Sequence, residues 1–125
     1  MRRLKIFFDG GCRPNPGRME VAAVAQGIPY VDRDIGTGSG HEAEWRALLH
    51  AVRIARALGA KDIELIGDSI AIIGVASGVQ KPRPADLPHL AAYRSAIAGL
   101  AVVRLRHVRR SKNLAGIALA QGHPR

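Results

Sequence analysis

The spacing of apolar residues changes near residue 41, and this change restricts the folds open to the chain. Residues 4–8, 21–26 and 29–35 are short apolar runs separated by turn residues, as in strands joined by tight connections. Residues 41–58 instead place apolar side chains at helical spacing, and Gly59 ends the run. The helical stripe consists of Trp45, Leu48, Leu49, Val52 and Ala55. The pattern predicts an antiparallel meander followed by a long amphipathic helix.

The second half of the chain alternates between the two periods. We expect strands at residues 62–66 and 102–108, helices at 70–76, 90–100 and 113–121, and a proline-containing linker at 78–88. A length of 125 residues suits one domain rather than two. The expected fold is a single α/β domain over residues 1–125. Its mixed five-stranded sheet has antiparallel strands first and parallel strands afterwards, with helices on both faces.

The composition is that of a globular domain, with 47% apolar and 23% charged residues. The longest uncharged stretch, residues 69–80, is shorter than the roughly 20 apolar residues of a membrane span, so we expect no membrane contact. The single cysteine, Cys12, cannot form an internal disulfide. That absence favours a reducing compartment, and we expect a cytoplasmic protein.

The charge balance is strongly basic. Nineteen Lys and Arg residues against ten Asp and Glu residues give a net charge of +9, and fifteen of the nineteen are Arg. A compact basic domain favours a polyanionic partner, because neutralised phosphates release condensed counterions, and Arg holds phosphate with a planar fork. Enrichment of Arg and Ala in a GC-rich genome explains the same numbers. Charge alone therefore only suggests a nucleic-acid binder.

Three acidic residues occupy positions from which their side chains can meet. Asp9 is expected at the end of the first strand, and Asp68 follows the strand at 62–66. Glu44 lies in the first turn of the long helix, at the rim of its apolar stripe. Ligands gather at the carboxyl ends of strands in open α/β sheets, and hard oxygen ligands suit Mg²⁺. As an alternative, Asp68 caps the following helix and Asp9 serves its turn.

Three motifs surround these acids in order along the chain. Residues 8–17 read FDGGCRPNPG, a strand aspartate followed by a Gly-Cys-x-x-Asn-Pro-Gly loop. Residues 43–49 read AEWRALL, and residues 67–69 read GDS. In these motifs the chain resembles the type 1 ribonuclease H family, and the likeness runs from about residue 3 to residue 121. The resemblance implies the ribonuclease H-like fold, with which the expected strand order agrees.

The resemblance also implies an activity, two-metal hydrolysis of the RNA strand of RNA–DNA hybrids with Mg²⁺, or Mn²⁺ in its place. Asp9 would bridge both ions, while Glu44 and Asp68 would each help to hold one. The substrate would be contacted in its minor groove, where 2′-hydroxyls mark the RNA strand. The implied substrate-binding residues are Gly11, Cys12, Arg13, Asn15, Ser39 and His41.

The chain departs from the family in its last helix. The family has a fourth carboxylate there, in an Asn-x-x-Ala-Asp-x-Leu-Ala pattern. The matching segment, residues 113–120, contains no acid, and we assign Gly116 to the position of the missing fourth ligand. The family's flexible histidine is also not evident, and we expect His123 to belong to a frayed tail. Losing one ligand should weaken the binding of one metal ion without abolishing hydrolysis, since water can complete Mg²⁺ coordination.

The densest basic run lies at residues 104–112. It is explained equally well by phosphate contact and by a solvated edge strand protected by charge. We expect a monomeric hybrid endonuclease with Asp9, Glu44 and Asp68 as its catalytic residues; the sequence does not indicate protein partners. The rival is a nucleic-acid-binding module of the same fold that no longer cuts, which Gly116 favours. A fragment of a larger reverse-transcriptase-like protein is a third possibility, which the near-complete fold disfavours.

Overall fold

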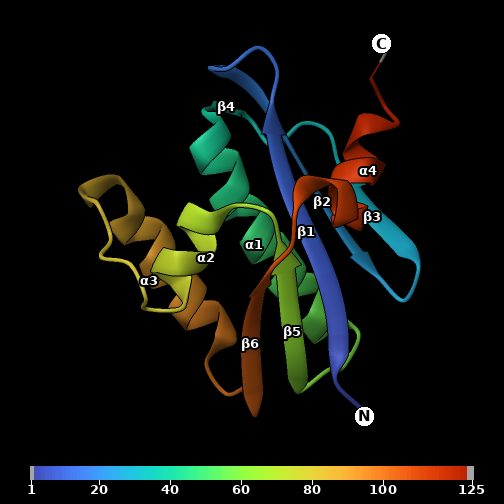
Figure 1. The fold of residues 1–125 in the computed structure, drawn as a ribbon, viewed down its shortest axis with the longest axis vertical. Helices are drawn as coiled ribbons and strands as arrows, with labels where there is room; N and C mark the ends of the chain where they lie inside the picture. Colours follow the sequence, from blue (N-terminus) through green and yellow to red (C-terminus); the bar gives the residue numbers. More distant parts are fainter. Residues whose placement is uncertain (1, 124–125) are drawn as a thin grey trace.

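Strand pairing builds a mixed sheet around β1 (Leu4–Cys12) in the computed structural model, which describes residues 2–123. On one side β1 pairs antiparallel with β2 (Gly17–Ala25), and β2 pairs antiparallel with β3 (Ile28–Asp32). On the other side β1 pairs in parallel with β5 (Asp62–Gly67), and β5 pairs in parallel with β6 (Val102–His107). The order across the sheet is therefore β3-β2-β1-β5-β6 (Figure 1). The expected mixed sheet, antiparallel first and parallel afterwards, is confirmed.

A sixth strand lies outside the expected five. β4 (Thr37–Gly38) pairs antiparallel with the start of β2, where Gly17 lies opposite Gly38. Two residues are too few to show the alternation that marks a strand, so the sequence pattern gives no sign of β4.

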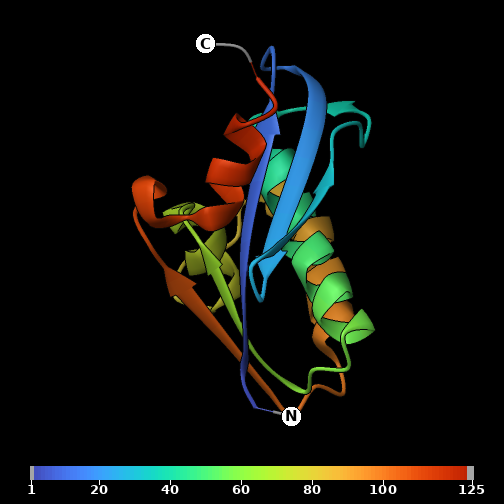
Figure 2. The ribbon, with the colours of Figure 1, turned by 90° about the vertical axis from the view of Figure 1, so that its right-hand side faces the viewer.

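The helices divide between the two faces of the sheet. α1 (Gly40–Ala57), α2 (Ile70–Ala76) and α3 (Leu87–Ile97) share one apolar core with the sheet. α4 (Leu114–Ala120) packs on the opposite face, against β1 and β2. Figure 2 shows α1 and α4 on opposite sides of these two strands. Helices on both faces were expected, and the structure confirms them.

The two faces of β1 carry different side chains because successive residues in a strand point to opposite faces. Leu4, Ile6 and Phe8 are buried in the core beneath α1. Phe7 points to the other face and packs in the smaller cluster with α4. Asp9 continues the Phe7 face, so its carboxylate lies between the sheet and α4 rather than in the main core.

The first strand is longer than expected, and Asp9 lies within it rather than at its end. β1 continues through Gly10 and Gly11 to Cys12, because β2 supplies pairing partners for all three residues. Two glycines in a row read as a turn in the sequence. Gly10 is instead required for packing, since a Cβ there would overlap the backbone carbonyl of Ala43 in α1.

The linker expected at residues 78–88 is shorter than expected. It contains a single 3₁₀ turn, Pro84–Asp86, and α3 begins directly afterwards at Leu87 instead of at residue 90. Pro88 lies in the first turn of α3, where the missing N–H costs no hydrogen bond. Across residues 2–123, no helix combines the length and the apolar character needed to cross a membrane.

Candidate metal centre and nucleic-acid cleft

Three elements bring three carboxylates together. Asp9 projects from β1, Glu44 from the first turns of α1, and Asp68 from the residue after β5. Phe7 of β1 lies opposite Ile66 of β5, so the same register places Asp9 beside Asp68 two residues later. One oxygen from each carboxylate lies within 4.8 Å of the other two. The convergence that the strand-end argument anticipated is therefore present.

Hydrogen bonds from neighbouring elements hold two of these side chains. The backbone N–H of Gly10 donates to Glu44 Oε1 at 2.6 Å. The side-chain amide of Asn113 donates to Asp68 Oδ2 at 2.9 Å and to the carbonyl of Phe8 at 3.0 Å. Asn113 is fully buried and also caps α4 by accepting from Ala115 N. Asn113 thus joins α4 to β1 and to the acidic cluster by hydrogen bonds. The sequence analysis did not predict this positioning role.

The acidic cluster is electrostatically unfavourable without a cation. Burial raises the pKa of Glu44, and the nearby charge of Asp9 raises it further. Burial also raises the pKa of Asp9, and Asp68 adds to the effect, although Arg110 opposes it. Ionising all three close carboxylates has a high free-energy cost, because their charges repel, unless a positive charge lies between them. The donor set is therefore of the kind that holds a hard divalent cation.

The carboxylates open into a cleft of about 530 Å³. One wall comes from the β1–β2 hairpin, and another comes from α4 and the turn before it. Residues of the expected substrate loop that line the cleft are Gly11, Cys12, Arg13 and Asn15. The Cys12 thiol lies 3.2–3.3 Å from the carbonyl oxygens of Pro14, Gly17 and Gly38, so it braces the hairpin. The structure thus brings this loop beside the acids, while its contact with substrate stays a prediction.

Ser39 and His41 lie beside the cleft rather than in its wall. Ser39 caps α1 by accepting a hydrogen bond from Glu42 N at 3.1 Å. His41 Nε2 lies 2.6 Å from Asp86 Oδ1, away from the acidic cluster. Of residues 39–41, only Gly40 lines the cleft. Substrate contact by Ser39 and His41 stays a prediction.

Position 116 is one of the positions on α4 that line the cleft, and it lies close to Asp9. A Cβ built on Gly116 would lie 3.3 Å from Asp9 Oδ2. Counting the family pattern from Asn113 puts its acid one residue later than Gly116, at Ile117, which also lines the cleft and is 45% exposed. Neither residue is acidic, so α4 offers no carboxylate at this point.

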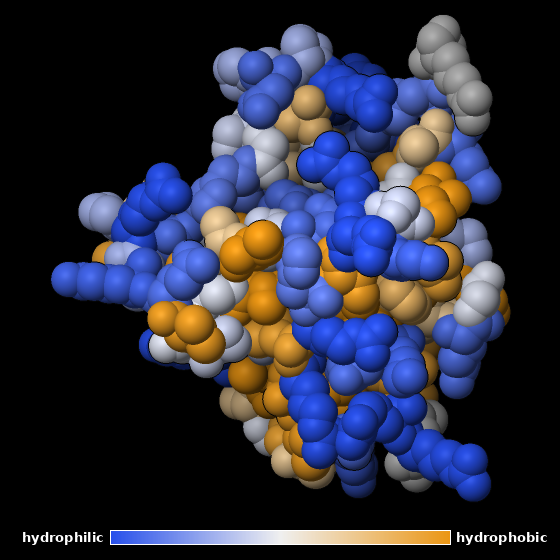
Figure 3. Space-filling view, viewed as in Figure 1, coloured by the Kyte–Doolittle hydropathy of each residue, from blue (hydrophilic) through white to orange (hydrophobic). Residues whose placement is uncertain are grey.

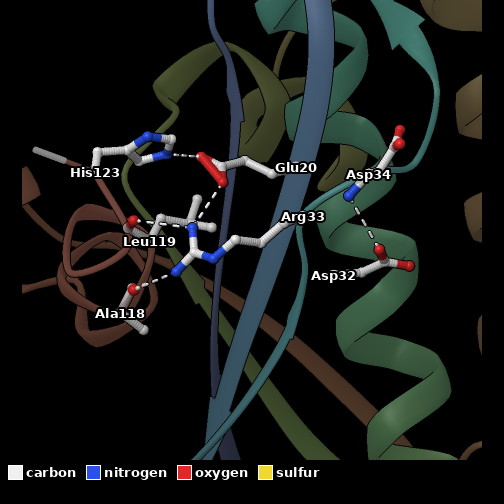
Figure 4. A network of polar contacts seen from close by, with 7 residues as sticks. All are labelled: Glu20, Asp32, Arg33, Asp34, Ala118, Leu119 and His123. Carbon is white, nitrogen blue, oxygen red and sulfur yellow. Dashed lines mark hydrogen bonds and ion pairs between the residues drawn. The ribbon is translucent and has the colours of Figure 1, made fainter.

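The end of the described chain is fixed, contrary to the frayed tail that we expected. His123 Nε2 lies 2.5 Å from Glu20 Oε2, and the other oxygen of Glu20 accepts from Arg33 at 2.8 Å. Arg33 also donates to the carbonyl oxygens of Ala118 and Leu119 at the end of α4 (Figure 4). Local sequence patterns could not predict these contacts, since His123 and Glu20 are 103 residues apart in the chain.

A second buried carboxylate, Asp86, has a structural role. It is 2% exposed and accepts hydrogen bonds from Trp45 Nε1 at 3.0 Å and from Arg83 N at 2.9 Å, with His41 as its third partner. Burial alone would raise the pKa of Asp86, but these partners lower it to about 2. The residue joins the start of α1 to the turn before α3.

Asp86→Ala is expected to lower the free energy of unfolding by about 2–4 kcal/mol at neutral pH, because Trp45 Nε1 loses its buried partner. Since the folded-state pKa is depressed, the contribution of Asp86 is complete above pH 4 and declines as the pH falls toward about 2. Urea unfolding of both proteins across this range measures the difference. Asp86→Asn, which keeps an acceptor oxygen, should cost less. A difference that is independent of pH would contradict the assignment.

Comparison of the sequence with known proteins gives one consistent result. Residues 30–123 match the family described as Reverse transcriptase-like. Ribonuclease HI of Halobacterium salinarum is 33% identical over 124 residues, which cover 94% of this chain. The chain spans only 62% of the length of that relative.

Solved structures agree with this result. The crystal structure of RNase H1 from Halobacterium salinarum superimposes with a TM-score of 0.86 at 31% identity and covers 94% of each chain. The N-terminal RNase H domain of a Mycobacterium tuberculosis protein gives a TM-score of 0.83 at 25% identity, covering 94% of this chain and 95% of that one. LC11-RNase H1 in complex with an RNA/DNA hybrid gives 0.77 at 25% identity, covering 88% of each.

Proposed function

The chain belongs to the type 1 ribonuclease H family, and from this premise we propose that it is an endonuclease that hydrolyses the RNA strand of RNA–DNA hybrids. The observation that carries the proposal is the cluster of Asp9, Glu44 and Asp68, whose oxygens lie within 4.8 Å of one another at the base of an open cleft. A partly buried cluster of three acids is stabilised by cations, which it can hold against a phosphate, whereas without cations the repulsion between its charges destabilises the fold.

The three carboxylates would hold two Mg²⁺ ions, or Mn²⁺ ions, with Asp9 shared and with Glu44 and Asp68 each serving one. Bound there, the ions would supply an activated water and stabilise the leaving 3′-oxygen. Asn113 orients Asp68, and Gly10 N orients Glu44, so both oxygens are fixed before an ion arrives. Arg110 lines the same cleft and adds positive charge beside the scissile phosphate.

Recognition of the RNA strand would fall to the hairpin wall of the cleft, including Cys12, Arg13 and Asn15. A minor groove that displays 2′-hydroxyls distinguishes RNA from DNA, and an exposed hairpin can enter that groove. The hybrid-bound LC11 relative supports this class of substrate. We propose that the protein acts as a monomer in the cytoplasm.

One observation favours a second candidate, a binding module that grips hybrids without cutting them. Gly116 faces Asp9, and Ile117 stands where the family pattern has its acid, so neither position on α4 adds a carboxylate to the cluster. Cleavage tests the choice: we expect the RNA strand of a hybrid to be cut, whereas RNA and DNA duplexes of the same sequence stay intact. Binding to all three duplexes without cutting would favour the binding module.

The basic run at residues 104–112 divides into two parts in the structure. Arg104 pairs with Asp62 at 3.3 Å, and Arg106 lies 3.9 Å from Glu64, both on the edge strand β6. Arg110 instead lines the cleft and lowers the pKa of Asp9. The charged-edge explanation therefore fits the first part of the run, and phosphate contact fits Arg110.

Arg110→Ala is expected to weaken hybrid binding and to reduce the slope of log K against log salt by about 1, because one phosphate contact is lost. Arg104→Ala, in the same run but paired on the sheet edge, serves as the matched control and should leave the slope near that of the wild type. Binding isotherms at several salt concentrations give both slopes. Equal slopes for the two variants would refute phosphate contact at Arg110.

A further inference from the structure

A second hollow, of about 260 Å³, adjoins the acidic cleft. Arg13, Arg18, Glu20, Arg33 and His123 line it, and two of these, Arg13 and Glu20, line the cleft as well. The two spaces therefore adjoin each other along the β1–β2 hairpin. Figure 3 shows hydrophilic side chains at the top of the view, the end of the molecule at which the β1–β2 hairpin lies. We call this hollow the arginine pocket.

Strand geometry places the arginine pocket on the same face of the sheet as the acidic cluster. Asp9 and Gly11 lie at alternate positions of β1 and share one face, and Arg13, one residue past the end of β1, lines both the cleft and the pocket. Glu20 lies opposite Gly11, and Arg13 N donates to the carbonyl of Arg18 at 3.2 Å. Four residues of extended chain separate Arg13 from Asp9, a distance of about 13 Å. This corresponds to about four base pairs along a duplex axis.

The single acid in the arginine pocket is already neutralised. Glu20 is 5% exposed, and its two oxygens are taken by Arg33 at 2.8 Å and by His123 at 2.5 Å, as Figure 4 shows. Arg33 is held further by the carbonyl oxygens at the end of α4. Glu20 therefore serves to fix Arg33, and it leaves little negative charge to repel an anion.

The other two arginines keep their charges available. Across residues 2–123, neither Arg13 nor Arg18 takes part in an ion pair, and both side chains are exposed. Two free guanidinium groups beside a fixed third one give the pocket a net positive charge. Guanidinium groups bind phosphate oxygens in a planar, two-pronged geometry, so the ligand that fits is a phosphate group.

We propose that the arginine pocket is a second phosphate-binding subsite, which holds a backbone phosphate of the hybrid a few base pairs from the cut. The inference rests on the proposed function, because it takes the hybrid as the ligand. Arg18 is its specific residue, since Arg13 also lines the cleft and Arg33 also holds α4. The subsite would extend the protein's contact with the hybrid beyond the acidic cleft, and it would set the hybrid length that is needed for full affinity.

Arg18→Ala tests this subsite, with Arg94→Ala as the matched control, because Arg94 is an exposed arginine on α3 outside both spaces. Hybrids of increasing length are titrated against the wild type and both variants, and KM and kcat are measured on the same set. The wild type and Arg94→Ala should gain affinity once the hybrid reaches the arginine pocket. The KM of Arg18→Ala on long hybrids should rise about three- to tenfold, and the magnitude of its salt slope should fall by about 1.

The outcomes separate the subsite from the proposed function. If Arg18→Ala matches Arg94→Ala in both length dependence and salt slope, the subsite is refuted, while cutting by the wild type still supports the nuclease. If the wild type binds long hybrids through Arg18 but cuts none, the subsite stands and the proposed nuclease fails. Circular dichroism melting of Arg18→Ala verifies that the variant is folded. An unfolded Ala variant would be replaced by Arg18→Gln, with the same two readouts.

Discussion

Asp9→Asn is expected to reduce hybrid cleavage by about 1,000-fold or more, since ions at a catalytic phosphate contribute several kcal/mol to transition-state stabilisation. Asp9 is the acid on which the cluster depends, because its charge raises the pKa of Glu44 and because Asp68 in turn raises the pKa of Asp9. Asparagine keeps the shape of the side chain and removes its charge. The loss should therefore fall on kcat, and hybrid binding should stay close to that of the wild type.

The same variant has a second readout that does not depend on activity. Removing one charge from a crowded acidic cluster relieves repulsion, so metal-free Asp9→Asn should melt at a higher temperature than the metal-free wild type. Mg²⁺ should raise the melting temperature of the wild type and have little effect on the variant. Asp34→Asn, an exposed acid outside the cleft, is the matched control. Unchanged turnover in Asp9→Asn would refute the metal assignment.

Gly116→Asp is expected to raise cleavage about tenfold at limiting Mg²⁺ and to have a smaller effect at saturation. A Cβ at position 116 would lie 3.3 Å from Asp9 Oδ2, so once the Asp9 side chain has shifted by a few tenths of an ångström, a carboxylate there adds a ligand at the edge of the cluster. The backbone tolerates the change, because Gly116 lies in a helix, where glycine is itself unfavourable.

Gly116→Asn separates ligation from helix stabilisation, because it has the same shape without the charge. Titration of Mg²⁺ against initial rate, for both variants and the wild type, gives the concentration at half-maximal activity. We expect this concentration to fall for Gly116→Asp only. An equal response of the Asp and Asn variants would show that the missing carboxylate does not limit the enzyme.

Local patterns in the sequence predicted the architecture well, because each element carries its own period. The stripe in α1 and the apolar runs of β5 and β6 were located within a few residues. The end of β1 was placed wrongly because Gly10 and Gly11 carry no side-chain pattern. Only the pairing with β2 and the close approach of Ala43 explain why the strand continues there.

The acidic cluster was predictable, but much of what holds it was not. Asp68 follows the end of β5, and the parallel register of β1 with β5 places Asp9 beside it, an arrangement that the expected topology suggests. Asn113 donates a hydrogen bond to the carbonyl of Phe8, which lies 105 residues earlier in the chain, and no hydrophobic periodicity predicts such a contact. Asp86 is similar: it lies in a segment that reads as a linker, yet its partner is Trp45 in α1. Long-range polar contacts depend on the folded arrangement, and a local pattern does not encode them.

The most direct test of the whole account is cleavage of an RNA–DNA hybrid labelled on its RNA strand, by the unmodified protein with Mg²⁺, with Mn²⁺ and with a chelator. We expect the RNA strand to be cut with either metal, the DNA strand to stay intact, and the chelator to stop the reaction. Hybrid binding without cutting in both metals would contradict the account and leave a nucleic-acid-binding module in its place.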